Sequence, residues 1–311
     1  MSSVISIIIP FLNEAENIRT LTDKLDNYCR ANQSSSFEII FVDDGSSDDS
    51  VSLLKNSKIE SATTKIIKLS KNFGSHAALR AGILHATGDY ITFMYADLQD
   101  PLELIGNLHQ KCLNGNEIVW ATRSETQAGL VERLFSSGYA AMMRKFAVPA
   151  FPAKGFDIVM FGKKTQLNLN QNIEANSSIF LQILTLGFKQ DTIFYVKDQR
   201  KFGKSKWTLS KKIKLFIDSF IAFSFAPIRL VTIIGTILFI CGSLFSVYLV
   251  LRKLMFNDLE QGWAALISIL MIGFGITNIS LGIIAEYLWR TLDASRKRPV
   301  FVIDEIIDLK K

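Results

Sequence analysis

The sequence has few cysteines and lacks the glycine motifs that bind nucleotides in the commonest α/β folds. Its three cysteines, Cys29, Cys112 and Cys241, are scattered without a C-x-x-C pair. We therefore expect neither a disulfide framework nor a cysteine-bound zinc site. No G-x-G-x-x-G and no G-x-x-x-x-G-K-[S/T] occurs in the 311 residues. These absences disfavour a Rossmann dinucleotide site and a P-loop nucleoside triphosphatase.

Positively charged residues are in mild excess, and their positions along the chain are more informative than their number. The formal net charge is +6 and the isoelectric point is near 9.1. The basic residues gather in residues 197–214 and 295–299, each beside an apolar segment. That placement favours a membrane surface and phosphate ligands over nucleic acid, so we expect no nucleic-acid partner.

Long uncharged runs are absent from the first two thirds of the chain and dominate the last third. Residues 1–10 have no basic flank before a short apolar run, so we expect a strand there rather than a secretory leader. Residues 230–251 carry no charge, which is about 33 Å of helix. A second apolar run covers residues 262–288. Basic flanks and a near-neutral link predict two transmembrane helices with both ends in the cytosol.

Shorter segments flank these apolar runs. Residues 207–225 mix lysines with apolar residues at helical spacing, which suits a helix lying in the membrane interface. The alternative is a helix packed on the globular part. Residues 298–306 alternate like a short strand that could dock back on that part. Glycines within the apolar runs allow close helix approach inside one chain or between chains, which leaves a homo-oligomer open.

Short apolar runs and amphipathic helices alternate through the first two hundred residues. The predicted strands are residues 4–10, 37–44, 64–70, 89–95 and 117–122, and the predicted helices are residues 15–30, 47–56, 76–86 and 102–114. Almost wholly apolar strands are typical of parallel sheets with both faces covered. The pattern predicts a doubly wound, mostly parallel α/β domain, in which ligands bind beyond the carboxyl ends of the strands.

Acids follow directly at the end of the second predicted strand. Asp43 and Asp44 stand there, where carboxylates can accept hydrogen bonds from ribose hydroxyls or from a base edge. The following polar residues, 46–49, suit capping of the next helix instead. We therefore assign ligand binding to the two acids and capping to residues 46–49.

The stretch after the fourth predicted strand is also acidic. Asp97 with Gln99 or Asp100 offers the oxygen ligands that a hard divalent cation prefers. The alternative for this stretch is a plain turn, in which Asp100 caps the helix that follows Pro101. On its own the stretch does not decide between a metal site and a turn.

Five stretches together resemble, in order and spacing, the family-2 glycosyltransferases of the GT-A fold. They are SIIIPFLNEAENI, FVDDGSSDDS, KLSKNFGSHAALRAGILHATGDY, ADLQDP and RKFGKSKW. The similarity is greatest to the polyprenyl-phosphate glycosyltransferases, which include dolichyl-phosphate mannosyltransferases and the bactoprenol glucosyltransferases of O-antigen modification, and it extends over nearly the whole chain. With the apolar runs, this predicts a GT-A catalytic domain over residues 1–206 and a juxtamembrane amphipathic helix over 207–228. Two transmembrane helices within 229–289 and a cytosolic tail or strand over 290–311 follow.

The resemblance assigns roles to matching positions. The positions that it assigns to the nucleotide are Pro10, Asn13, Glu14, Asp43, Asp44, Asn72, Gly74, Gln99 and Ser205. Asp97 and Gln99 match the motif that holds Mg²⁺ or Mn²⁺. Tyr95 stands where that motif has its first acid, and a protonated tyrosine is a poor ligand for these ions.

The remaining matches concern catalysis. Asp157 matches the catalytic carboxylate, and Gly162 stands where a second acid is usual. Arg200 and Lys206, with Lys204 and Ser205 between them, match the basic loop that closes over phosphates. The alternative for this loop is a solvated cationic segment that touches lipid headgroups.

The resemblance implies an enzyme that transfers one sugar, with inversion, from UDP-glucose or a related UDP-hexose. The implied acceptor is undecaprenyl phosphate at the cytosolic face of the bacterial inner membrane, in a multi-pass protein. Two alternatives stay open, namely a weakened scaffold that binds nucleotide sugar without turnover and a transferase for a different lipid. A processive polysaccharide synthase is disfavoured, because no Q-x-x-R-W motif occurs.

Overall fold

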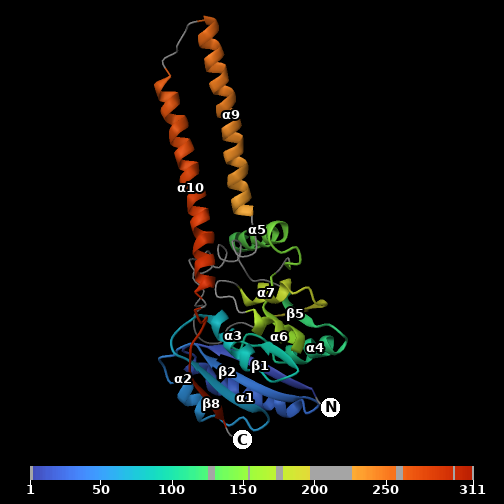
Figure 1. Cartoon of the computed structure of the whole chain (residues 1–311). Helices are drawn as coiled ribbons and strands as arrows, with labels where there is room; N and C mark the ends of the chain where they lie inside the picture. The colour runs from blue at the N-terminus through green and yellow to red at the C-terminus, as the bar shows by residue number, and fades with distance from the viewer. Residues whose placement is uncertain are drawn as a thin grey trace. The chain divides into compact units, whose positions relative to one another are not determined.

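We describe residues 3–124, 130–152, 155–172, 178–196, 226–256, 262–296 and 298–309 of a computed structural model. The chain divides into two compact units, one made of Met1–Ser219 with Pro299–Lys311 and the other of Phe220–Arg298. The first unit carries an α/β fold and the second consists of long helices (Figure 1). Each unit is considered separately.

An eight-stranded sheet forms the centre of the first unit, in the order β7-β5-β6-β4-β1-β2-β3-β8. The strands are β1 (Val4–Phe11), β2 (Ser36–Asp43), β3 (Thr63–Leu69), β4 (Tyr90–Phe93), β5 (Ile118–Arg123), β6 (Ile158–Gly162), β7 (Gln190–Tyr195) and β8 (Ile303–Leu309). Only β6 and β8 run antiparallel to their neighbours. The predicted mostly parallel α/β sheet is therefore confirmed.

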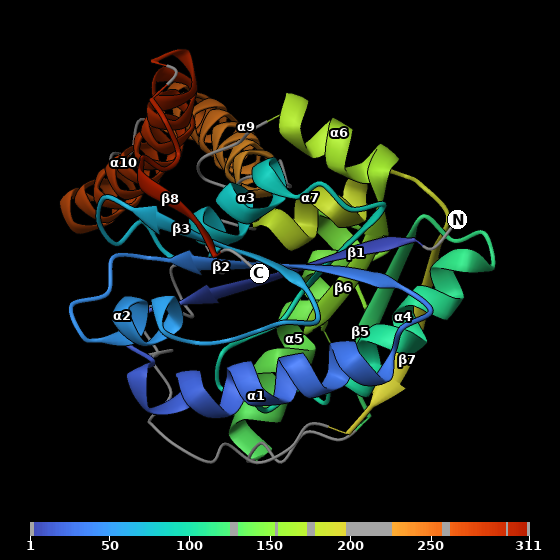
Figure 2. The ribbon, with the colours of Figure 1, turned by 90° about the horizontal axis from the view of Figure 1, so that it is seen from below.

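Helices cover both faces of this sheet (Figure 2). Helices α1 (Ala15–Ala31), α2 (Ser50–Lys55) and α4 (Glu103–Leu113) bury their apolar side chains in one core with alternate residues of β1. Helices α3 (Ser75–His85), α6 (Lys163–Gln171) and α7 (Ile179–Thr185) lie on the opposite face, and α5 (Leu130–Phe146) follows β5. Residues 7–9 of β1 are fully buried, because a strand covered on both faces has no solvent-facing side.

Predicted and observed boundaries differ at two places that matter for the site. The strand predicted over residues 89–95 ends at Phe93, so Tyr95 and Asp97 belong to the turn that follows it. The helix predicted over 47–56 begins only at Ser50, which leaves residues 44–49 as an extended loop beside the end of β2.

The chain returns to the sheet after the helical unit. β8 pairs antiparallel with β3, with Ile67 opposite Ile306. Lys68 binds Asp304 across this pair at 2.9 Å. A short strand was predicted here from alternation alone, and β8 overlaps the predicted residues.

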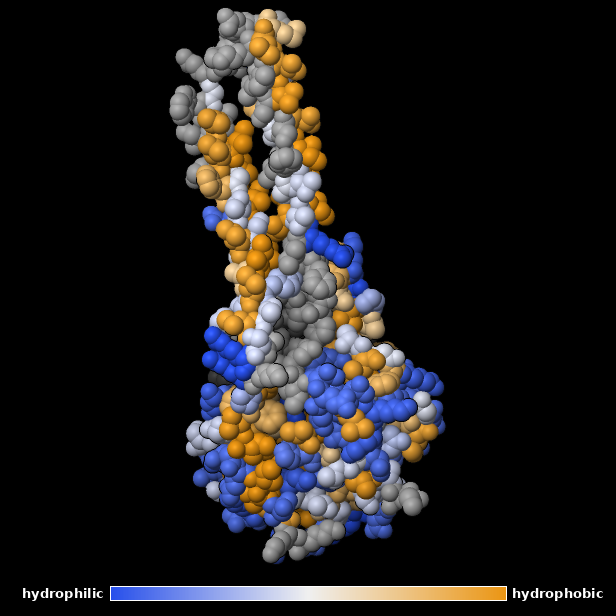
Figure 3. Space-filling model, viewed as in Figure 1, coloured by the Kyte–Doolittle hydropathy of each residue, from blue (hydrophilic) through white to orange (hydrophobic). Residues whose placement is uncertain are grey.

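Two long helices, α9 (Ala226–Phe256) and α10 (Trp263–Ser295), make up the described part of the second unit. Many of their apolar side chains are exposed (Figure 3). Within the described residues, one stretch, Ile272–Asp293, is long and apolar enough to cross a membrane, and Val231–Gly242 is a shorter apolar stretch. The predicted interfacial helix at 207–228 lies almost wholly outside the described residues.

Candidate functional site

The carboxyl ends of the parallel strands meet at one edge of the sheet, as expected for a doubly wound fold. The end of β1 lies beside the end of β2, with Phe11 opposite Asp43. The ends of β5 and β7 are likewise adjacent, with Arg123 opposite Tyr195. Asp157 reaches the same edge from the start of the antiparallel β6, and its amide donates to the carbonyl of Ala121 at 3.1 Å.

The first loop, after β1, is fastened to the second loop, after β2. Asn13 has a φ of 52°, a left-handed conformation that asparagine tolerates better than most residues. Its backbone amide donates to Ser46 Oγ at 2.9 Å, and its Oδ1 accepts from the amide of Ser47 at 2.8 Å. The next amide, of Glu14, donates to Ser50 Oγ at 2.9 Å. Pro10 is buried in β1 just before this loop.

Of residues 46–49, which were predicted to cap α2, Asp48 does meet the start of that helix. Its Oδ1 accepts from the amide of Ser50, the first residue of α2, at 3.1 Å and from Ser50 Oγ at 2.6 Å. Asp49 is the N-cap residue of α2, and its side chain makes no cap hydrogen bond. Asp48 Oδ2 also accepts from the amide of Ala15 at 3.1 Å, so Asp48 joins the start of α2 to the start of α1.

The two acids after β2 have different partners. Asp43 is fully buried; its Oδ1 accepts from the amide of Ser46 at 2.8 Å, and its Oδ2 is buried without a hydrogen bond. Asp44 accepts from the amides of Phe73 at 2.8 Å and of Gly74 at 3.0 Å. Burial and the neighbouring Asp43 raise the pKa of Asp44. The carboxylate of Asp44 thus fastens the third loop, after β3.

Close approach of the second and third loops requires a glycine at position 45. Gly45 has a φ of 78°, and a Cβ there would lie 2.7 Å from the backbone nitrogen of Asn72. Asn72 itself is exposed. We call residues 12–14, 44–49 and 70–74 the first three loops; their mutual hydrogen bonds form one frame at the sheet edge.

The turn after β4 carries the predicted metal ligands. Asp97 Oδ1 accepts from the amide of Gln99 at 3.3 Å. Leu98 between them has a φ of 57°, which is strained for a residue with a branched side chain. Asp100 is 4% exposed and accepts a hydrogen bond from the phenol of Tyr195 at 2.6 Å. Asp100 is not the predicted helix cap, because α4 starts after Leu102 and has no side-chain cap.

Tyr95 precedes the two carboxylates of its own turn, Asp97 and Asp100. Its pKa is raised by burial and by the negative charges of Asp100, Asp157 and Asp97. The phenol therefore stays protonated at neutral pH and does not act as a charged ligand. Arg123, which binds Asp157, lies opposite Tyr195, which binds Asp100, so Asp157 and this turn lie at the same edge of the sheet.

Arg123 and Tyr195 were missed in the sequence. Arg123 binds Asp157 through two nitrogens, Nε at 2.8 Å and Nη2 at 2.5 Å. Asp157 raises the pKa of Arg123 further. Arg123 ends β5 and Tyr195 ends β7, so both stand at strand ends, as Asp43 does. The same rule could have found Arg123 after the fifth predicted strand, and it could have found Tyr195 had β7 been predicted. We call Tyr95, Asp97, Asp100, Arg123, Asp157 and Tyr195 the tyrosine–carboxylate cluster.

Gly162 has no place in this cluster. It lies at the far end of β6, opposite Tyr90 at the start of β4. A Cβ on Gly162 would lie 2.9 Å from the carboxylate oxygens of Glu117. An acid at this position would face Glu117, so the position that the resemblance matched to a second acid lies away from the tyrosine–carboxylate cluster.

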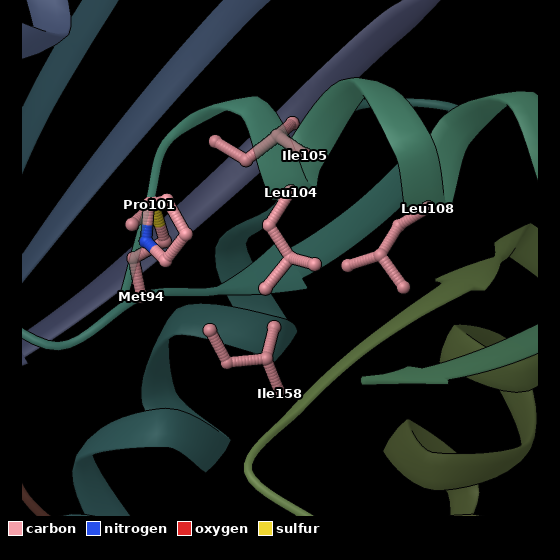
Figure 4. A pocket seen from close by; sticks show the side chains of 6 residues that line it. All are labelled: Met94, Pro101, Leu104, Ile105, Leu108 and Ile158. Carbon is pink, nitrogen blue, oxygen red and sulfur yellow. The ribbon is translucent and has the colours of Figure 1, made fainter. Parts of the chain in front are cut away.

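The turn between β4 and α4 also covers a small apolar gap (Figure 4). Its lining residues are Met94, Pro101, Leu104, Ile105, Leu108 and Ile158. None of them offers a hydrogen-bonding side chain, so this gap cannot recognise a phosphate or a sugar. The candidate site is therefore formed by the polar loops at the sheet edge and not by this gap.

The turn after β4 supplies part of the ligand set that a divalent cation needs. Asp97 and Gln99 supply a carboxylate and an amide oxygen on one turn, which are donors that Mg²⁺ and Mn²⁺ accept. In the part of the chain that the structure describes, no group of three acidic, histidine or cysteine side chains could hold an ion alone. A cation here would need further oxygens from a bound phosphate. Arg200, Lys204, Ser205 and Lys206 lie outside the described residues.

The fold and this polar edge define a glycosyltransferase, and comparison with known proteins identifies its family. Residues 6–178 match the family described as Glycosyl transferase family 2. The chain belongs to that family, and its sheet is of the GT-A-like, mostly parallel kind.

Relatives match along almost their whole length. The chain is 31% identical to an uncharacterized glycosyltransferase, YkcC, of Bacillus subtilis over 96% of this chain and 93% of that protein. It is 30% identical to the undecaprenyl-phosphate 4-deoxy-4-formamido-L-arabinose transferase of Proteus mirabilis over 99% of this chain and 95% of that protein. It is 29% identical to a prophage bactoprenol glucosyl transferase homolog of Escherichia coli over 97% of this chain and 99% of that protein.

Proposed function

We propose that the protein transfers a single sugar from a nucleoside-diphosphate sugar to undecaprenyl phosphate at the cytosolic face of a bacterial inner membrane. The observation that carries the proposal is the set of polar groups at one edge of the sheet. Asp157 is bound to Arg123 there, the turn of Asp97 and Asp100 is bound to Tyr195, and the ends of β1 and β2 with their loops lie at the same edge. The names of two relatives, which specify undecaprenyl phosphate and bactoprenol, support this acceptor. UDP-glucose or a related UDP-hexose is the proposed donor, and O-antigen modification is a pathway that would use the product.

The first three loops would bind the nucleotide. Asp43 keeps one buried oxygen without a hydrogen bond, and a donor group on the base or ribose would remove the cost of leaving it unpaired. Asp44 acts one step further away, by holding the backbone of Gly74. The other contacts to the nucleotide would come from Pro10, Asn13, Glu14, Asn72, Gln99 and Ser205.

Asp97 and Gln99 would hold the Mg²⁺ or Mn²⁺. When bound, such an ion neutralises the diphosphate and so stabilises it as a leaving group. Tyr95 adds no negative charge beside this position, so the protein supplies a single carboxylate on the turn.

Transfer would proceed by in-line attack of an acceptor phosphate oxygen on the anomeric carbon, with inversion. A phosphate monoester has a second pKa of about 6 and is largely ionised at neutral pH, so it needs little help from a base. Asp157, oriented by two hydrogen bonds from Arg123, would position a sugar hydroxyl or take the remaining proton. Arg200 and Lys206 would offset the repulsion between two anionic substrates.

The return of the chain to its sheet supports two membrane spans. β7 and β8 belong to one sheet, although the helical unit lies between them in sequence. A chain that leaves and re-enters one folded unit must cross a bilayer an even number of times. The candidate span Ile272–Asp293 therefore calls for a second, and α9, with its uncharged residues 230–251, supplies it. The basic residues that flank these helices support a cytosolic position for the catalytic unit.

A donor panel tests the proposal directly. Purified protein in lipid nanodiscs would receive undecaprenyl phosphate and, in turn, UDP-glucose, UDP-galactose, UDP-GlcNAc and GDP-mannose. We expect glycolipid from one UDP-hexose, dependent on both the lipid and a divalent cation. Arg200→Ala is expected to raise the KM for the lipid phosphate. Transfer that ignores the prenyl phosphate would overturn the proposed acceptor.

A further inference from the structure

The hydrogen bond between Tyr195 and Asp100 joins parts of the sheet that are not neighbours. Asp100 follows β4, and Tyr195 is the last residue of β7. Two strands, β5 and β6, lie between β4 and β7 in the sheet. The phenol therefore reaches across the strand ends that carry Arg123 and Asp157 to meet the turn of Asp97 and Gln99.

Tyr195 is itself held firmly. Its backbone carbonyl accepts hydrogen bonds from Ser124, from the amide at 2.8 Å and from Oγ at 3.1 Å. Its side chain is 8% exposed and is part of the apolar core. A side chain anchored at the backbone and along its ring has little freedom, so its hydroxyl defines a fixed point for Asp100.

The turn that Tyr195 meets does not adopt a relaxed conformation. Leu98 has a positive φ of 57°, and such strain persists only when surrounding contacts hold it. Within the turn, the hydrogen bond between Asp97 and the amide of Gln99 is long, at 3.3 Å. The shorter bond at Asp100 and the burial of Leu98 therefore contribute to holding the turn in place.

We propose that Tyr195 is a positioning residue that holds the Asp97–Gln99 turn in the geometry that binds a cation-bound nucleoside diphosphate. The inference rests on the proposed function, because it takes that turn to be the diphosphate side of the site. It assigns no chemical step to the phenol. It also links the turn to the end of β7, where the described chain stops just before the basic residues 197–206.

Three variants of the full-length protein in nanodiscs separate this role from simple packing. Tyr195→Phe removes only the hydroxyl. Tyr28→Phe is the matched control, since it removes the hydroxyl of a partly buried tyrosine beside Gly106 of α4, outside the site. Asp100→Asn keeps an oxygen that can accept from the Tyr195 hydroxyl.

Calorimetric titration with Mn²⁺ and UDP, and separately with Mn²⁺ and GDP, provides the first measurement. We expect Tyr195→Phe to weaken binding of the nucleotide that the wild type binds about tenfold, and Tyr28→Phe to change it less than about twofold. Asp100→Asn is expected to lose less affinity than Tyr195→Phe. Wild-type affinity in Tyr195→Phe, or a larger loss in Asp100→Asn, overturns the proposal.

Hydrogen exchange of residues 95–100 provides a second measurement that needs no nucleotide. A turn released by Tyr195→Phe should exchange faster than in the wild type and in Tyr28→Phe. If the wild type binds neither nucleotide with Mn²⁺, the proposed function is wrong, and the exchange data alone decide whether Tyr195 holds the turn. Unchanged exchange then overturns the inference as well.

Discussion

The first three loops and the tyrosine–carboxylate cluster share one sheet edge but use acidic side chains in different ways. In the loops, carboxylates and hydroxyls accept hydrogen bonds from backbone amides 29 to 33 residues away, as Asp44 does from Phe73 and Ser46 from Asn13. In the cluster, side chains bind side chains, as Arg123 does with Asp157 and Tyr195 with Asp100.

This difference indicates what each region can tolerate. An acid whose oxygens receive backbone amides sets the path of the chain, so its loss should first affect stability. An acid that faces other side chains sets charge and orientation, so its loss should first affect turnover. Variants at Asp97, Asp44 and Asp43 test the distinction.

The largest effect is expected at Asp97. Asp97→Ala removes the one carboxylate on the turn that would face the cation, and loss of a single preorganised electrostatic group costs about 10²–10³-fold in rate. Initial rates of glycolipid formation at varied Mn²⁺ would measure it, with melting temperature as the control for folding. A variant that keeps wild-type turnover in EDTA would remove Asp97 from the metal site.

Asp44 should show the opposite behaviour. Asp44→Ala leaves the amides of Phe73 and Gly74 without their acceptor and is expected to lower the free energy of unfolding by about 3 kcal/mol. Asp43→Ala removes one such hydrogen bond and should destabilise less while weakening nucleotide binding more. Equal destabilisation by the two variants would contradict the assignment of a mainly structural role to Asp44 and a mainly binding role to Asp43.

A smaller effect is expected at Gly45. Gly45→Ala places a Cβ 2.7 Å from the backbone of Asn72 at a positive φ, and we expect a loss of about 2 kcal/mol in stability. Gly115→Ala is a suitable control, because its φ is also positive but no atom lies near the added Cβ. Similar melting temperatures for both variants would show that loop contact is unimportant.

An effect of similar size, but confined to acidic pH, concerns His76 at the start of α3. Burial lowers the pKa of its imidazole from 6.5 to about 4, and its ring packs against Phe180 of α7. Below pH 6.5 the unfolded chain binds a proton that the folded protein does not, so stability is full above pH 6.5 and is lost as the pH falls toward 4. Relative to wild type, His76→Phe should lose about 2 kcal/mol less stability between pH 7 and pH 5. Parallel pH curves for the two proteins would contradict this.

The order of strands and helices as far as β5 was predictable because each is encoded locally. Residues 4–11 form an apolar run and residues 36–43 a largely apolar one, a pattern typical of strands covered on both faces. The insertion of the antiparallel β6 between β4 and β5 was not predictable, since pairing between distant segments leaves no local pattern. For the same reason the sequence did not show that Gly162 lies away from the cluster.

The candidate site was predictable in kind and less so in detail. The rule that ligands bind at strand ends indicated Asp43 and Asp97, and the resemblance to the family indicated Asp157. Neither could show that Asp48 would bind the amide of Ala15 as well as that of Ser50, because a contact between distant loops leaves no local pattern. Tyr195 was missed because β7 was not identified as a strand.

The pairing of β8 with β3 has a consequence for biosynthesis. Lys68 and Asp304, which bind across this pair, are 236 residues apart. At translation rates of about 5–20 residues per second, β3 waits roughly 10–50 s for its neighbour, and the hydrophobic helices must emerge from the ribosome in between. Until then the edge of the sheet stays open to other chains. Completion of the sheet is thereby coupled to synthesis of the two long helices, and any delay in making them prolongs the time for which nascent chains carry an aggregation-prone edge.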